Sequence, residues 1–187
     1  MSVVKGFDTN INGEYIEGYL SDKEHFNGVL FLLKEPNTNG EIQNEFYFRK
    51  CLYKEENNST IDSYVEYLRQ ILSNISVNRN LENCAYANMI PYCGMHKESE
   101  KYKKLSNKER VERFESLLND KTDIVFVCRN EFDAIIKEKN IEWKENCGIK
   151  YSNKPNSKRM LQYSDKITVY EIYHPSYIHS FNITCIK

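Results

Sequence analysis

The sequence predicts an α/β fold with three layers, α/β/α, around a central, mostly parallel four-stranded sheet. Four short apolar runs have the length and composition of buried parallel strands, and helix-like segments separate them. The order strand, helix, strand, helix, strand, helix, strand is typical of a parallel sheet covered by helices. No linker rich in proline, glycine or serine divides the 187 residues, so we expect one domain over residues 1–187.

Each predicted strand is a run of mostly apolar residues. The four runs are Gly28–Leu33, Cys84–Ile90, Asp123–Cys128 and Lys166–Tyr173. Prolines close two of them, because Pro91 follows the second run directly and Pro175 lies just beyond the fourth. Cys128, which ends the third run, is interpreted as a core residue.

Helical spacing and capping residues predict the helices between these strands. The first helix has apolar residues at Ile61, Val65, Leu68, Leu72 and Ile75, with Ser59 or Thr60 as its N-cap. Ser106 and Glu109 form a capping-box pattern ahead of a second apolar stripe. Asn130 is expected to cap a short helix that ends at Ile136.

Two segments give weaker patterns. Residues 142–165 are polar and rich in lysine, which suits either a long loop or a small extra pair of strands. We expect the first 27 residues to form a helix or an arm that covers the sheet.

Composition excludes several classes of protein. The longest fully apolar run, Val29–Leu33, has five residues, which is too short to cross a bilayer. Met1–Asn10 contains no apolar stretch of the kind that a secretory signal needs, so we expect a cytoplasmic protein with no membrane partner. The net charge of −1 means that any basic surface for nucleic acid must be local.

The six cysteines predict neither disulfides nor a metal centre. They include no C-x-x-C pair, and reduced thiols are the ordinary state inside a cell. Cys84, Cys93 and His96 match no zinc or iron–sulfur spacing. We therefore expect no metal and no cofactor.

Polar residues follow the predicted strands at the points where each strand ends. Glu35 follows the first, Asn88 lies at the end of the second, Arg129 follows the third and His174 follows the fourth. In an open parallel sheet, ligands bind beyond the carboxyl ends of the strands. A carboxylate, an amide and an imidazole are therefore expected at one edge, where they would suit acid–base or hydrolytic chemistry.

The same segments carry a resemblance to a known family. Leu33–Asn37, Ala87–Pro91 and His174–Tyr177 resemble, in this order, three signature motifs of the uracil-DNA glycosylase superfamily. The resemblance spans roughly residues 28–181. It implies that the chain hydrolyses the N-glycosidic bond of uracil, or of a related damaged pyrimidine, in single- or double-stranded DNA.

The resemblance also implies roles for single residues. Glu35 falls on the carboxylate that positions the attacking water, and His174 falls on the residue that stabilises the departing uracil anion. Asn88 falls on the amide that binds the edge of the uracil, and Phe48 on the aromatic residue that stacks on it. Asn37 falls where the best-known branch has a tyrosine that excludes the methyl group of thymine.

Three further residues are implied to contact DNA. Lys34 lies inside the first motif, Ser176 falls on a serine that contacts a phosphate, and Ile178 falls on the apolar wedge that replaces the flipped base. Two lysine-rich runs suit either phosphate contacts or an ordinary solvated surface. They are Lys97, Lys101, Lys103, Lys104 and Lys108, and Lys150, Lys154, Lys158 and Arg159.

The same residues are compatible with two other functions. One is a catalytically inactive relative that binds DNA or a nucleobase ligand through the same cleft; in either case we expect a monomer. The other is an unrelated doubly wound domain that binds a small phosphorylated ligand, although the chain lacks a glycine-rich phosphate loop. The chain contains no G-x-S-x-G nucleophile motif, which disfavours an α/β-hydrolase.

Overall fold

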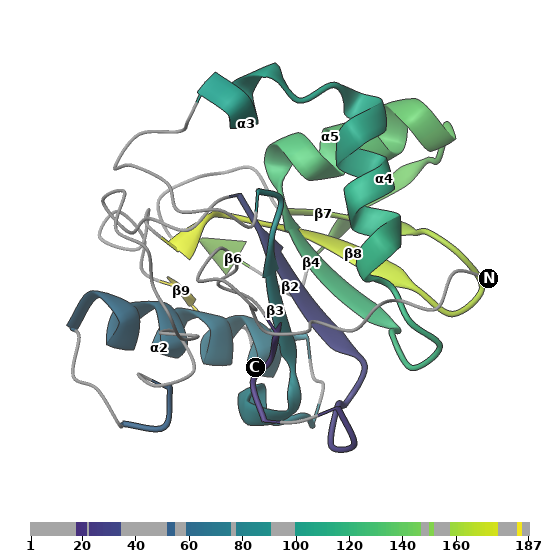
Figure 1. Ribbon diagram of the computed structural model, residues 1–187. Helices are drawn as coiled ribbons and strands as arrows, with labels where there is room; N and C mark the ends of the chain where they lie inside the picture. Colours follow the sequence, from purple (N-terminus) through teal and green to yellow (C-terminus); the bar gives the residue numbers. More distant parts are fainter. Residues whose placement is uncertain are drawn as a thin grey trace.

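The computed structural model describes residues 18–21, 23–34, 52–54, 59–75, 78–90, 100–146, 150–151, 158–175 and 183–184. Their main feature is a seven-stranded sheet in the order β1-β3-β2-β4-β8-β7-β5 (Figure 1). The strands are β1 (Gly18–Tyr19), β2 (Val29–Leu33), β3 (Ala85–Asn88), β4 (Ile124–Cys128), β5 (Trp143–Asn146), β7 (Lys158–Gln162) and β8 (Thr168–Ile172). Separately, β6 (Lys150–Tyr151) pairs with β9 (Ile183–Thr184).

The α/β class is confirmed, while the predicted number of strands is corrected from four to seven. The four neighbours β3, β2, β4 and β8 are parallel and correspond to the four apolar runs. β1, β7 and β5 pair antiparallel, so the sheet is mixed. The polar segment 142–165 therefore contains both β5 and β7, which pair with each other and form the extra strand pair that was one of its two predicted structures.

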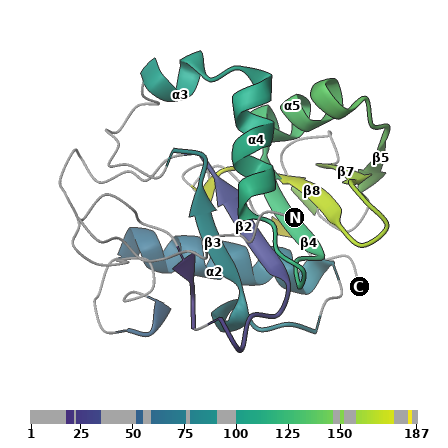
Figure 2. The ribbon, with the colours of Figure 1, turned by 45° about the vertical axis from the view of Figure 1, so that its right-hand side comes forward.

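Helices lie on both faces of the sheet. α2 (Ser59–Asn74) covers one face, and α4 (Asn107–Leu117) and α5 (Arg129–Lys139) cover the other (Figures 1 and 2). The short helix α3 (Glu100–Lys104) precedes α4, and a 3-10 turn, η1 (Leu81–Asn83), precedes β3. Among the described residues, no helix combines the length and the apolar character needed to cross a membrane.

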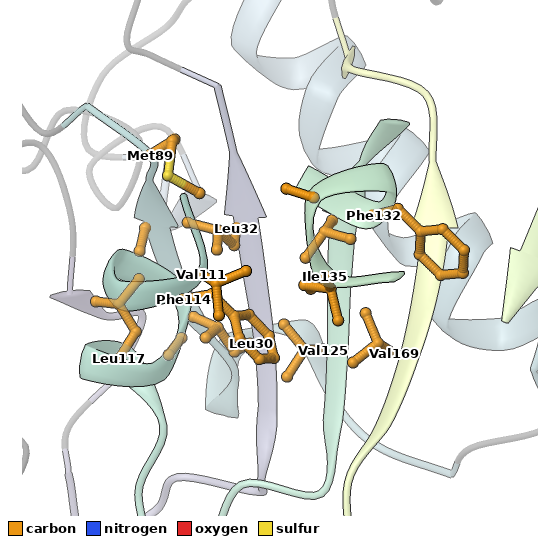
Figure 3. Packing of buried hydrophobic residues seen from close by; sticks show 14 of the residues in the cluster. Leu30, Leu32, Met89, Val111, Phe114, Leu117, Val125, Phe132, Ile135 and Val169 are labelled. Atoms are coloured by element: carbon orange, nitrogen blue, oxygen red, sulfur yellow. The ribbon is translucent and has the colours of Figure 1, made fainter. Parts of the chain in front are cut away.

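The strand residues alternate between two hydrophobic clusters, as the pleat requires. Val29, Phe31 and Leu33 of β2 pack with α2, whereas Leu30 and Leu32 pack with α4 and α5. Figure 3 shows the second cluster, in which Leu30 lies near Phe114 of α4. Every residue of β2 is buried, which explains why its sequence is a continuous apolar run.

An aromatic row crosses three parallel strands on the face covered by α2. Phe31 and Phe126 are register partners, and their rings stack with centroids 4.8 Å apart. Phe126 and Tyr170 are also partners, with centroids 5.5 Å apart. The row therefore joins β2, β4 and β8 through side chains as well as through backbone hydrogen bonds.

The expected cap of α5 is corrected. The helix begins at Arg129, directly after β4, and its N-cap is Cys128 rather than Asn130. Cys128 is 1% exposed, so its prediction as a core residue is confirmed. The side-chain amide of Asn130 donates instead, through Nδ2, to the hydroxyl of Tyr102, 3.3 Å away.

The capping box of α4 is confirmed. The Glu109 amide donates to Ser106 Oγ at 3.2 Å, and the Ser106 amide donates to Glu109 Oε2 at 2.8 Å. Removing the Ser106 hydroxyl leaves a helix donor without its acceptor. We expect Ser106→Ala to lower the free energy of unfolding by about 1 kcal/mol in urea denaturation.

Ser116→Ala is the matched control, since Ser116 lies exposed near the other end of α4. Its hydroxyl donates to the Arg113 carbonyl within the same helix. Because alanine is the better helix former, this change should leave stability unaltered or slightly raised. Equal losses in the two variants would contradict a capping role for Ser106.

Candidate functional site

The candidate site is the edge of the sheet where the parallel strands end. β2 is followed by α2 and β3, whereas β4 is followed by α5 and leads to β8 on the opposite side. The connections thus diverge between β2 and β4, and ligands of such sheets bind at this point beyond the strand ends. Lys34 follows β2, Asn88 is the last residue of β3, and His174 follows β8 by two residues.

The structure therefore places three of the eight predicted site residues at one edge. The other five, Glu35, Asn37, Phe48, Ser176 and Ile178, lie outside the described residues. Glu35 is adjacent in sequence to Lys34, and Ser176 follows His174 by two residues.

The backbone of Asn88 is held from two directions. Asn88 is 0% exposed and is the register partner of Leu33 on β2. Its carbonyl accepts hydrogen bonds from Arg113 of α4, at 3.3 Å from Nε and 3.2 Å from Nη2. Backbone hydrogen bonds continue past the strand end, because the Ile90 amide donates to the Lys34 carbonyl at 3.0 Å. A buried amide on a fixed backbone suits the recognition of a flat polar ring.

His174 lies in the segment that follows β8. Residues of α2 and α5 lie close to this segment. The Tyr67 hydroxyl of α2 donates to the Tyr173 carbonyl at 2.8 Å. His174 is half-buried, and Pro175 after it is buried. Burial and the charge of Glu171 raise the pKa of Tyr173, while the nearby Arg129 guanidinium opposes that rise. Arg129, at the start of α5, therefore lies near the segment that carries His174.

A buried polar cluster of Tyr102, Arg110 and Glu131 joins three helices beside this edge. Glu131 Oε1 accepts from the Tyr102 hydroxyl at 2.7 Å and from Arg110 Nη1 at 2.6 Å. Arg110 Nη2 also donates to the Tyr102 carbonyl at 2.7 Å. Glu131 is 1% exposed, and its Oε2 has no hydrogen-bond partner among the described residues.

Burial governs the titration of this cluster. Loss of solvent raises the pKa of Glu131, while the Tyr102 hydrogen bond and the Arg110 charge oppose the rise. Burial, with the neighbouring Glu131 charge, raises the pKa of Tyr102, which therefore stays a hydrogen-bond donor at neutral pH. The Lys34 ammonium lies 5.8 Å from the centroid of the Tyr102 ring, which connects the cluster to the end of β2.

Sequence reasoning missed this cluster. Its members are far apart in the chain, and Tyr102 stands among lysines that suggest a solvated helix. The one available signal is Glu131, an acidic residue in the first turn of a helix that directly follows a buried strand.

The described residues of the two lysine-rich runs differ in their surroundings: Arg159 is held in ion pairs, whereas the described lysines of the first run are exposed. Arg159 forms ion pairs with Glu171 at 2.8 Å and Asp133 at 2.7 Å, and its guanidinium lies over the ring of Phe132. Arg159 of β7 therefore connects β8 and α5 through these ion pairs. Lys101, Lys103, Lys104 and Lys108 are exposed.

The edge thus combines an amide, an imidazole and a primary ammonium group. Together they can bind a polar heteroaromatic ring and stabilise an anion. Within the ranges that the structure describes, no group of three or more histidine, cysteine, aspartate or glutamate side chains is placed to hold a metal ion.

Comparisons with known proteins identify no relative of this chain. The chain matches no family model, no curated protein and no solved structure. A functional proposal therefore depends on the chain's own residues and their arrangement.

Proposed function

We propose that the protein is a divergent member of the uracil-DNA glycosylase superfamily. Acting as a monomer, it would hydrolyse the N-glycosidic bond of uracil, or of a related damaged pyrimidine, in DNA. One observation carries the proposal: Asn88 and His174, which are far apart in the sequence, lie at the same carboxyl edge of the parallel part of the sheet, at the ends of β3 and β8. The described parts of the three signature-like motifs, residues 33–34, 87–90 and 174–175, lie at this edge, and ligands of such sheets bind there, which supports the proposal.

The chemistry of the two residues supports this function. The side-chain amide of Asn88 has a carbonyl oxygen that can accept from N3–H of a pyrimidine and an NH2 group that can donate to its O4. A neutral His174 imidazole can donate a hydrogen bond to the uracil anion as it leaves. Three strand spacings, about 14 Å, separate β3 from β8, so a base held by both Asn88 and His174 would have to bridge this span beyond the ends of β2 and β4.

The remaining residues complete the proposed reaction. Glu35 would position the water and stabilise the cationic sugar, as carboxylates do in other glycoside hydrolysis. Phe48 would stack on the base and Ile178 would fill its place in the duplex. Lys34 and Ser176 would contact phosphates, and the small side chain of Asn37 would leave room at C5 of the base.

The test is cleavage of an oligonucleotide that carries one uracil, followed by alkali to break the abasic site. We expect the wild-type protein to give a strand break at the uracil. His174→Gln should lower the single-turnover rate about 100- to 1,000-fold, the usual loss when one donor to a developing anion is removed.

His25→Gln is the matched control, because His25 is exposed and precedes β2 at the opposite edge of the sheet. Its rate should equal that of the wild type. Equal losses in both histidine variants would contradict the role of His174. Binding of the oligonucleotide without any breakage would overturn the enzymatic proposal in favour of the inactive, base-binding relative.

A further inference from the structure

Helix α3 brings positive charge to the carboxyl edge of the sheet. It lies beyond the ends of β2 and β3 (Figures 1 and 2). Its five residues include three lysines and one glutamate, a net charge of +2 in a chain whose total is −1. Lys101, Lys103 and Lys104 are all exposed, so this charge faces solvent.

Tyr102, the one uncharged residue of α3, anchors the helix. Tyr102 is 0% exposed and is the one buried residue of the helix. Its hydroxyl donates to Glu131 and its carbonyl accepts from Arg110, as described above. The Arg110 guanidinium also lies 4.4 Å from the centroid of its ring. The lysines are therefore presented from a helix that buried contacts hold in place.

Two more cations lie beside α3. Lys34, at the end of β2, approaches the Tyr102 ring, and Arg129 is the exposed first residue of α5. Asn130, next to Arg129, donates to the Tyr102 hydroxyl. These contacts define a basic rim, which consists of Lys34, Lys101, Lys103, Lys104 and Arg129.

Within the described ranges, two exposed or half-buried carboxylates pair with residues of the basic rim. Glu100 pairs with Lys103 at 3.0 Å, and Asp133 lies 3.8 Å from Arg129. Glu100 is 73% exposed, and such exposed ion pairs contribute little free energy, so a phosphate can replace the carboxylate. Glu131 is buried and already faces Arg110.

We propose that the basic rim binds the phosphate backbone of DNA, with Lys101 and Lys104 of α3 as direct contacts. The inference rests on the proposed function, because that function makes DNA the partner of this edge. It adds a contact surface outside the three motifs. Phosphate contacts carry no base information, so the basic rim would hold the strand while the residues at the strand ends select the base.

The test measures binding of a fluorescent duplex that contains no uracil, at several salt concentrations. If both lysines contact phosphates, Lys101→Gln/Lys104→Gln should reduce the slope of log K against log salt by about 1.8, which is about 60-fold in affinity at 0.1 M salt. Lys121→Gln/Lys166→Gln is the matched control, because these exposed lysines precede β4 and β8 at the opposite edge. The control should keep the wild-type slope.

Three outcomes would overturn the inference: no binding by the wild type at low salt, an unchanged slope in Lys101→Gln/Lys104→Gln, or equal losses in the two double variants. Because the duplex lacks uracil, its binding does not depend on cleavage. Cleavage of uracil by the wild type with an unchanged slope in the α3 variant would leave the proposed function standing and reject the basic rim. A reduced slope without cleavage would do the reverse.

Discussion

Replacing Arg110 by methionine should lower the free energy of unfolding by about 3–5 kcal/mol, because the change leaves a buried carboxylate without its counter-ion. The side chains of Arg110 and Glu131 are 6% and 1% exposed, and 2.6 Å separates Nη1 from Oε1. In the variant, the Tyr102 hydroxyl would be the main remaining hydrogen-bond donor to Glu131. Urea denaturation at pH 7 measures the loss.

Two companion variants isolate the cause. Lys108→Met, on the same helix at a position that is 77% exposed, should change stability by less than about 0.5 kcal/mol. Adding Glu131→Gln to Arg110→Met removes the uncompensated charge and should restore part of the loss. A double variant as unstable as Arg110→Met alone would assign the loss to packing instead of charge.

The loss in Arg110→Met should also depend on pH. Burial already raises the pKa of Glu131, and removing Arg110 removes a charge that opposes the rise. A carboxyl group whose pKa is higher in the folded state binds more protons there, so folding is stabilised as the pH falls through that pKa. The difference between variant and wild type should therefore shrink from pH 8 towards pH 5.

Replacing Gly28 by alanine should lower the free energy of unfolding by about 2–5 kcal/mol, through backbone strain and overpacking together. Gly28 has φ +91°, which side-chain-bearing residues rarely adopt. A Cβ at this position would lie 2.6 Å from the Lys121 carbonyl oxygen and 2.6 Å from Asp123 Oδ1. Asp123 cannot easily move away, because the Arg79 guanidinium holds both of its oxygens.

Chemical denaturation tests this second prediction. The midpoint should fall while the slope m stays constant, which indicates a change of stability in an otherwise intact fold. Asn80→Ala provides the control, since Asn80 is exposed and its side chain makes no capping hydrogen bond at η1. If Gly28→Ala is as stable as Asn80→Ala, the close approach between the starts of β2 and β4 does not require a glycine at position 28.

The parallel part of the sheet was predictable because its strands are buried on both faces. Val29–Leu33 and Ile124–Cys128 are continuous apolar runs, and their predicted bounds differ from the observed ones by one residue. β7 (Lys158–Gln162) was not predicted as a definite strand, because it contains lysine, arginine and glutamine. Its Leu161 is buried while Gln162 is exposed, and this short alternation is hard to separate from a loop in sequence.

The candidate site was predictable only where chemistry follows from position in a strand. The shared position of Asn88 and His174 could be predicted because each lies at a predicted strand end, and parallel strands bring their ends to one edge. The pairing of Arg110 with Glu131 depends on how α4 and α5 pack, and no local pattern encodes it. The two residues are the buried polar groups of helices whose other polar residues are exposed or half-buried.

The aromatic row formed by Phe31, Phe126 and Tyr170 has a consequence for how the strands find their alignment. In a hairpin, the turn sets which residues face each other, but β2, β4 and β8 are separated by long connections that impose no alignment. The rings provide one: a shift of β4 by a single residue would send Phe126 to the opposite face, against α4 and α5. Each strand thus has one position along its neighbour at which its largest side chain meets another ring.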